Sequence, residues 1–236
     1  MNPRRAFAPA VLAVAVAAML AGPLPADSYS GSGPAGERIV RAPVWVYLEP
    51  VPGNLATGET NPVVPPLAEL ENLSRFVLEG MVFGWRVVYT PPDRARAVEE
   101  YFEMVPLARL PEQDNRLKLT ELRARYPLLE TWAELTLDAA TARHIDRWQS
   151  VLFRTVQGRG TGERTAEAEG IRDAYRAAVL NAVREHARTL EKNKPKEIHA
   201  DVLLRGEPRL HTGQGRFVAN LRLILHVREI VPYRSW

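Results

Sequence analysis

The 236-residue chain contains no cysteine. This absence excludes disulfide bonds, thiolate metal sites and a cysteine nucleophile, and it leaves no acceptor for the lipid of a bacterial lipoprotein. A folded domain of this chain therefore has to be stabilised by its apolar core. Chains above roughly 150 residues bury about 70% of their surface, so the length suffices for such a core.

Lysine is also scarce, because it occurs only at positions 118, 192, 194 and 196, and arginine supplies most of the positive charge. The formal net charge is +3, of which Arg4 and Arg5 contribute two units. A nucleic-acid-binding domain concentrates basic residues on one face. So small an excess of positive charge predicts a protein without a nucleic-acid partner.

The motifs of several large enzyme classes are missing as well. The sequence has no G-x-S-x-G nucleophile elbow, no H-E-x-x-H zinc motif, no G-x-x-x-x-G-K-[ST] phosphate loop and no calcium-binding loop. These absences leave the catalytic residues, if the protein is an enzyme, unknown from the sequence.

The first 26 residues have the order of a secretory signal peptide. A basic start precedes an apolar run over residues 6–20, and small residues then lead to Ala26. The run is shorter than the roughly 20 residues that a membrane-spanning helix needs, and no later segment is apolar for long enough. We therefore expect cleavage near Ala26 and a periplasmic or secreted protein, with an uncleaved N-terminal anchor as the alternative.

Small polar residues follow the expected cleavage site, and residues 27–41 are predicted to be a flexible leader. Residues 42–236 are predicted to form a single domain. The glycines at 158, 160 and 162 favour a flexible connector over residues 157–163. Two loosely joined halves that divide near residues 158–162 are therefore the alternative.

Apolar periodicity predicts most of the secondary structure. Spacings of three and four residues predict helices over residues 66–82, 91–105 and 166–190. Alternating apolar residues, many of them β-branched or aromatic, predict strands over residues 42–48, 85–89, 133–137, 151–155, 198–204 and 217–228. The proline-rich residues 50–66 are predicted to be a long loop.

Helices and antiparallel strands thus follow one another without a regular βαβ alternation. The sequence predicts an α+β fold, with helices packed on a mostly antiparallel sheet and a long C-terminal β-hairpin. The two last strands form that hairpin, and residues 210–215 are its predicted loop.

The terminal hairpin supplies a candidate metal site. If the chain turns around Thr212 and Gly213, every apolar residue of one strand meets an apolar residue of the other, and His199 lies opposite His226. Asp201 then lies two residues along on the same face, and two imidazoles with a carboxylate could bind Zn²⁺ or another divalent metal. Registers two residues away keep the same facing but separate the histidines, which would then be ordinary solvated side chains.

Three arginines on the last strand, Arg216, Arg222 and Arg228, form a predicted basic stripe that could bind an acidic glycan or another anionic surface. A solvated strand face is the alternative. His144 and Asp146, which lie in a predicted turn between strands, offer an acid–base pair, and an ordinary polar turn is the alternative that we favour.

These features favour an exported, non-catalytic envelope protein with a binding or scaffolding role. Its partner would be another envelope protein or an acidic glycan. The alternative function is a metal-assisted periplasmic hydrolase that uses His199, His226 and Asp201, and no cofactor other than that divalent metal is expected.

Overall fold

The computed structural model describes residues 31–32, 38–49, 65–150, 152–190 and 194–233. The predicted signal peptide, most of the predicted leader and residues 50–64 of the predicted loop lie outside these ranges. In the part of the chain that is described, the helices are all too short or too polar to cross a membrane.

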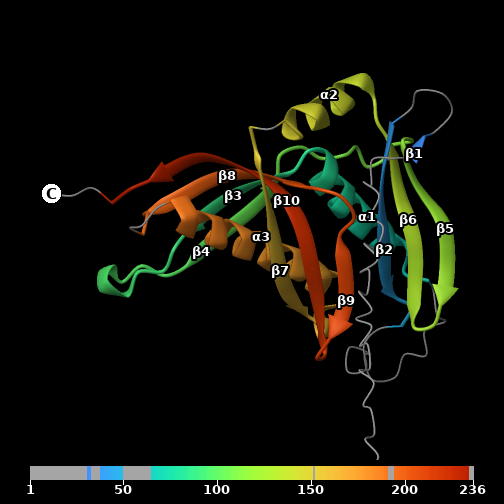
Figure 1. The fold of residues 1–236 in the computed structure, drawn as a ribbon. Coiled ribbons are helices and arrows are strands. Elements are labelled where there is room, and N and C mark those ends of the chain that lie inside the picture. The colour runs from blue at the N-terminus through green and yellow to red at the C-terminus, as the bar shows by residue number, and fades with distance from the viewer. Residues whose placement is uncertain (1–30, 33–37, 50–64, 151, 191–193, 234–236) are drawn as a thin grey trace, which may run out of the picture.

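Two antiparallel sheets form the frame of the fold (Figure 1). The first sheet has the order β1-β2-β6-β5 and contains β1 (Gly31–Ser32), β2 (Arg38–Tyr47), β5 (Leu117–Arg125) and β6 (Leu128–Thr136). The second sheet has the order β4-β3-β8-β10-β7 and contains β3 (Trp85–Thr90), β4 (Tyr101–Pro106), β7 (Arg154–Glu163), β8 (Glu197–Leu204) and β10 (Arg216–Val231). A further strand, β9 (Arg209–Gly213), pairs with β10.

Three α-helices in the described residues pack on these sheets: α1 (Leu67–Val82), α2 (Ala139–Trp148) and α3 (Glu167–Leu190). Helix α1 contacts β2 and β6 of the first sheet and β8 of the second. Helix α3 runs along one face of the second sheet, over β7 and β10, and α2 lies near the end of that sheet (Figure 1). The predicted α+β class with mostly antiparallel strands is confirmed, and one apolar core is shared by both sheets and by α1 and α3.

The long strand β10 organises the second sheet. Its odd-numbered residues from Phe217 to Leu225 are buried, as the alternation in the sequence predicts. One edge of β10 pairs with β7, and the other edge pairs first with β9 and then with β8. The predicted hairpin loop is shorter than expected, because Arg209–Gly213 form a strand and the turn consists of Gln214 and Gly215.

The prediction of a flexible connector over residues 157–163 is wrong. These residues belong to β7, which pairs with β10 over ten positions. The glycines at 158, 160 and 162 lie under α3, where the helix backbone leaves no room for a Cβ atom. The small residues Gly170, Ala174 and Ala178 give α3 a matching surface. Glycine therefore allows close packing of helix on sheet here, instead of loop flexibility.

The predicted helix over residues 91–105 is also wrong. A short 3₁₀ turn (Arg94–Arg96) follows Asp93, whose side chain accepts a hydrogen bond from the backbone nitrogen of Ala95. Ala97 then has a left-handed conformation, and the chain returns as strand β4 beside β3. The apolar residues 95, 98, 102 and 105 fit a helical spacing, but strand pairing with β3 determines the structure.

The segment around His144 is a helix and not a turn. Asp138 caps α2, because its carboxylate accepts a hydrogen bond from the backbone nitrogen of Thr141 at 2.8 Å. Thr141, Ile145 and Trp148 are the buried face of this helix. The predicted strand over residues 151–155 begins later, at Arg154, and residue 151 lies outside the described residues.

Candidate ligand groove

A groove of about 450 Å³ lies between α1, the edge strand β4 and the first half of α3. We call it the α1–β4 groove. Its lining is apolar at the bottom and rich in arginine at the sides: Asn72, Arg75, Phe76, Glu79, Trp85, Met104, Val105, Pro106, Arg109, Leu110, Glu112, Arg172 and Arg176. Ligand sites in proteins have this size and this combination of apolar surface with a few polar groups.

Aromatic rings form the floor of the groove. The ring centroids of Phe76 and Trp85 lie 5.4 Å apart, and Phe76 meets Tyr175 of α3 edge-on at 5.6 Å. Trp85 fits under α1 because residue 80 is glycine, where a Cβ atom would lie 2.1 Å from the indole ring. The floor is therefore rigid, and Met104 of β4 extends it towards the open edge of the sheet.

Arg75 and Glu79, one turn apart on α1, hold the segment 109–112 that forms one wall. The Arg75 guanidinium donates hydrogen bonds to the backbone carbonyls of Pro111 and Glu112. The Glu79 carboxylate accepts a hydrogen bond from the backbone nitrogen of Leu110 at 2.8 Å. These contacts fix a wall that lacks regular secondary structure.

Burial raises the pKa of the Glu79 carboxyl above its ordinary value. The hydrogen bond from Leu110 and the charges of Arg109 and Arg75 oppose this rise without cancelling it. A half-buried carboxyl with a raised pKa in a groove of this kind is typical of functional sites.

The arginines of the groove differ in how far they are neutralised. Arg172 and Arg176 both bind the Glu169 carboxylate, at 2.9 and 2.5 Å, and their hydrogen bonds lower its pKa. Arg176 also pairs with Asp173 at 2.9 Å. Arg109 is exposed and forms no ion pair with any residue that the structure describes. Its guanidinium is thus the group best placed to meet an anionic ligand.

The predicted opposition of His199 and His226 is wrong. His226 lies opposite Asp201, and His199 lies opposite Glu229. Up to Val227, the pairing of β8 with β10 is shifted by two residues from the predicted register. An irregularity of the ladder after Val227 increases this shift to three residues. A shift of two preserves the facing of every side chain, so the apolar pattern does not distinguish the two registers.

The residues of the predicted metal site instead bind separate neighbours. Asp201 pairs with Arg86 at 3.1 Å, and His199 Nε2 lies 2.6 Å from a carboxylate oxygen of Glu197. Within the described ranges, no three or more histidine, aspartate or glutamate side chains gather as a group that could hold a metal ion. The metal-assisted mechanism requires His199 opposite His226, and the structure does not place them so.

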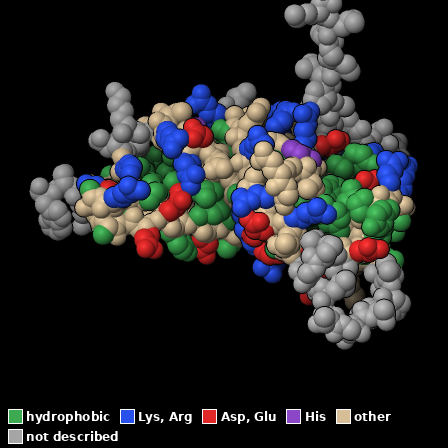
Figure 2. Space-filling view, turned by 90° about the horizontal axis from the view of Figure 1, so that it is seen from below, with side chains coloured by type: hydrophobic (Ala, Val, Ile, Leu, Met, Phe, Trp, Pro, Cys, Tyr) green, Lys and Arg blue, Asp and Glu red, His purple; other side chains and the backbone are tan. Residues whose placement is uncertain are grey.

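The predicted basic stripe lies on the outer face of β10 but does not converge. Arg216 pairs with Glu163 at 2.6 Å, and Arg228 lies 3.8 Å from Asp201. Six residues of strand separate Arg222 from each of the other two arginines, which is about 20 Å. On the face seen in Figure 2, basic side chains lie among acidic and apolar ones.

His144 and Asp146 do not form a pair. The Trp148 indole nitrogen donates a hydrogen bond to His144 Nε2 at 3.1 Å. Asp146 binds the guanidinium of Arg38 in β2 at 2.7 Å. Asp146 therefore helps to attach α2 to β2, whereas the contact of His144 lies within α2.

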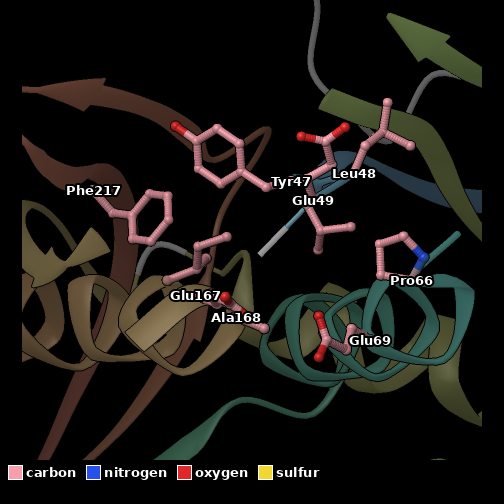
Figure 3. Close-up of a pocket in the computed structure, with 10 residues that line it drawn as sticks. Tyr47, Leu48, Glu49, Pro66, Glu69, Glu167, Ala168 and Phe217 are labelled. Atoms are coloured by element: carbon pink, nitrogen blue, oxygen red, sulfur yellow. The ribbon is translucent and has the colours of Figure 1, made fainter. Parts of the chain in front are cut away.

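A smaller cavity of about 120 Å³ lies where β2, α1, α3 and β10 meet (Figure 3). Glu49, Glu69 and Glu167 come from three different segments to line it, with the rings of Tyr47 and Phe217 on one side. A cluster of carboxylates alone does not identify a ligand. The α1–β4 groove is therefore the stronger candidate.

Sequence reasoning missed the α1–β4 groove because its lining is scattered along the chain. The contributing segments are residues 72–79, 104–112 and 172–176, together with Trp85. A correct assignment of β4 would have provided a signal, because it identifies an edge strand of the second sheet.

Comparisons with known proteins identify relatives of this chain. A protein-family model matches residues 28–233. An uncharacterized protein of Treponema pallidum (strain Nichols) is 38% identical over 208 residues, which cover 88% of this chain and 87% of that protein. No solved structure matches the chain.

Proposed function

We propose that this chain, which belongs to the family whose model covers residues 28–233, is an exported binding protein of the cell envelope. Its ligand has an apolar body and an anionic group, and it occupies the α1–β4 groove. The observation that carries this proposal is the aromatic floor of the groove beside the exposed guanidinium of Arg109, which forms no ion pair within the described residues.

The chemistry of the groove supports a binding role. An apolar body on Phe76, Met104 and the exposed Val105 would be removed from water, and each buried CH₂ group contributes about 0.8 kcal/mol. Arginine is well suited to a carboxylate or phosphate, since its planar guanidinium can donate two parallel hydrogen bonds. The groove's polar groups Arg75 and Glu79 are engaged in holding the wall, which favours ligand binding over acid–base chemistry.

Export is supported by the order of the first 26 residues and by the start of the family match. The match begins at residue 28, directly after the expected cleavage near Ala26. Cell fractionation followed by mass spectrometry of the protein's N-terminus tests this part. We expect an envelope or secreted fraction whose chain starts near residue 27. An intact Met1 in the soluble cytoplasmic fraction would exclude it.

Ligand binding is tested by calorimetry of the purified chain with decanoate, which joins an apolar chain to a carboxylate. Decyltrimethylammonium carries the same chain with the opposite charge and serves as the matched ligand. We expect decanoate to bind and the cation to bind at least tenfold more weakly.

Variants locate the site. Arg109→Gln removes the charge next to the groove, and we expect about tenfold weaker decanoate binding, equivalent to about 1.4 kcal/mol. Arg159→Gln on the exposed face of β7 is the matched control and should leave the affinity unchanged. Equal affinities of both variants for decanoate would place the ligand elsewhere and refute the proposed groove.

A further inference from the structure

Two half-buried tryptophans share one face of the first sheet. Trp45 of β2 is opposite Glu130 of β6, and Trp132 of β6 is opposite Pro43 of β2. The two indoles are thus diagonal neighbours on adjacent strands, with Cα atoms about 7–8 Å apart. The flanking residues Val44 and Val46 are buried on the other face of β2, towards the core.

A groove of about 250 Å³ lies on this face, and we call it the Trp groove. Its lining combines the two indoles with proline and charged side chains: Pro43, Val44, Trp45, Glu121, Arg123, Glu130, Thr131 and Trp132. It shares no lining residue with the α1–β4 groove. Any ligand of the Trp groove would therefore be recognised independently.

Hydrogen-bonding groups alternate with the rings across three strands. Glu130 is opposite Trp45 on one side and opposite Arg123 of β5 on the other. Arg123 pairs with Glu121 at 2.7 Å, and both side chains are at least half exposed. Carboxylate acceptors and a guanidinium donor therefore lie within one residue of an aromatic surface.

Both rings are held in place by neighbouring side chains. The Arg41 guanidinium lies 3.9 Å from the centroid of the Trp132 ring. Trp45 packs edge-on against Tyr47, with centroids 5.9 Å apart, and also contacts Phe217 of β10 at 5.9 Å. Fixed rings lose little conformational entropy on binding, which favours a ligand site.

From this arrangement we infer that the Trp groove binds an uncharged sugar chain. A pyranose ring has one face of C–H groups, which packs on indole, and a rim of hydroxyl groups that both donate and accept hydrogen bonds. Glu130 and Glu121 supply acceptors for those hydroxyls, and Arg123 supplies donors.

Other occupants fit less well. The lining holds two carboxylates and one guanidinium, and the Arg41 guanidinium over Trp132 balances the remaining charge. The groove therefore has no excess of positive charge that would attract a polyanion. A protein partner that covered the face would bury the charges of Glu130, Arg123 and Glu121, and burying charges is costly. Sugar hydroxyls instead replace the water around these charges with hydrogen bonds.

The test is calorimetry of the purified full chain with three uncharged tetrasaccharides: chitotetraose, cellotetraose and maltotetraose. We expect at least one of them to bind and to quench tryptophan fluorescence. Trp132→Ala should weaken that sugar more than tenfold, and Trp132→Phe should retain most of the affinity because it keeps an aromatic face. Glu130→Ala, at a partly exposed position of β6, should weaken it several-fold without loss of folding.

Trp148→Phe is the control, because Trp148 packs with Leu203 and Ile224 on the other sheet, and it should bind the sugar normally. No binding of the three sugars at millimolar concentration would overturn the inference. So would a salt-sensitive preference for heparin, or a dimer in sedimentation that dissociates in Trp132→Ala.

Discussion

Gly160 of β7 lies so close to α3 that a Cβ atom on it would be 2.1 Å from the backbone nitrogen of Ala178. Gly158 and Gly162 meet the backbone of the same helix at similar distances. The helix backbone is the obstacle, and it cannot move aside as the end of a flexible side chain can. The row of glycines therefore sets the distance between α3 and the second sheet.

Gly160→Ala is expected to destabilise the protein by about 3 kcal/mol, since it forces the helix away from a close-packed strand. Chemical denaturation followed by circular dichroism measures this change. Gly213→Ala is the matched control, because its added methyl would meet Val218 at an ordinary 3.5 Å. The control should change stability by less than about 1 kcal/mol. Equal losses in the two variants would contradict the role assigned to close packing.

Sequence periodicity predicts the elements that are long and regular. The alternation from Phe217 to Val227 gives β10, and the helical spacing of residues 166–190 gives α3 nearly to its ends. Periodicity fails to predict the structure where one spacing of apolar residues fits both a helix and a strand. Residues 95–105 fit a helix by spacing, but Tyr101–Pro106 pair with the edge of β3 and form a strand.

The candidate sites were harder to predict than the fold, for two physical reasons. Strand register is degenerate at steps of two, so the apolar pairing that places His199 opposite His226 equally allows the true pairing of His226 with Asp201. Both grooves also join segments that are remote in sequence, as the pairing of Pro43 with Trp132 shows. No local motif marks such a site.

The turn between β9 and β10 carries a residue with an unfavourable backbone conformation. Gln214 has φ 52° and Gly215 has φ 74°, the pattern of a two-residue turn that prefers Asn-Gly. We expect Gln214→Asn to stabilise the protein by about 0.5–1 kcal/mol, because asparagine tolerates the left-handed region. Thermal unfolding is the measurement.

Gly215→Ala provides the opposite change in the same turn. The space around Gly215 is open, with no atom within 4 Å of an added Cβ, so its cost arises from the backbone alone. We expect a loss of about 1 kcal/mol. A neutral Gly215→Ala together with a neutral Gln214→Asn would show that the turn conformation is not strained.

Glu79 is expected to make stability depend on pH. Burial raises its pKa in the folded protein, so folding favours the protonated form. The stabilisation from this group is complete below the ordinary carboxyl pKa and is lost as the pH rises through the raised value. Glu79→Gln stays uncharged, and its amide oxygen can still accept the hydrogen bond from the Leu110 nitrogen. The variant should therefore gain stability relative to the native chain over the pH range that begins at about 4 and ends above the raised pKa of Glu79.

Glu79→Leu separates the charge from the hydrogen bond. It leaves the buried Leu110 nitrogen without its acceptor, which costs about 1–3 kcal/mol at every pH. Urea denaturation of the native chain and of both variants across this pH range measures the two effects. If the difference between Glu79→Gln and the native chain stays constant with pH, the carboxyl does not titrate differently in the folded and unfolded states. Burial in the α1–β4 groove would then not be the cause of any stability change at this position.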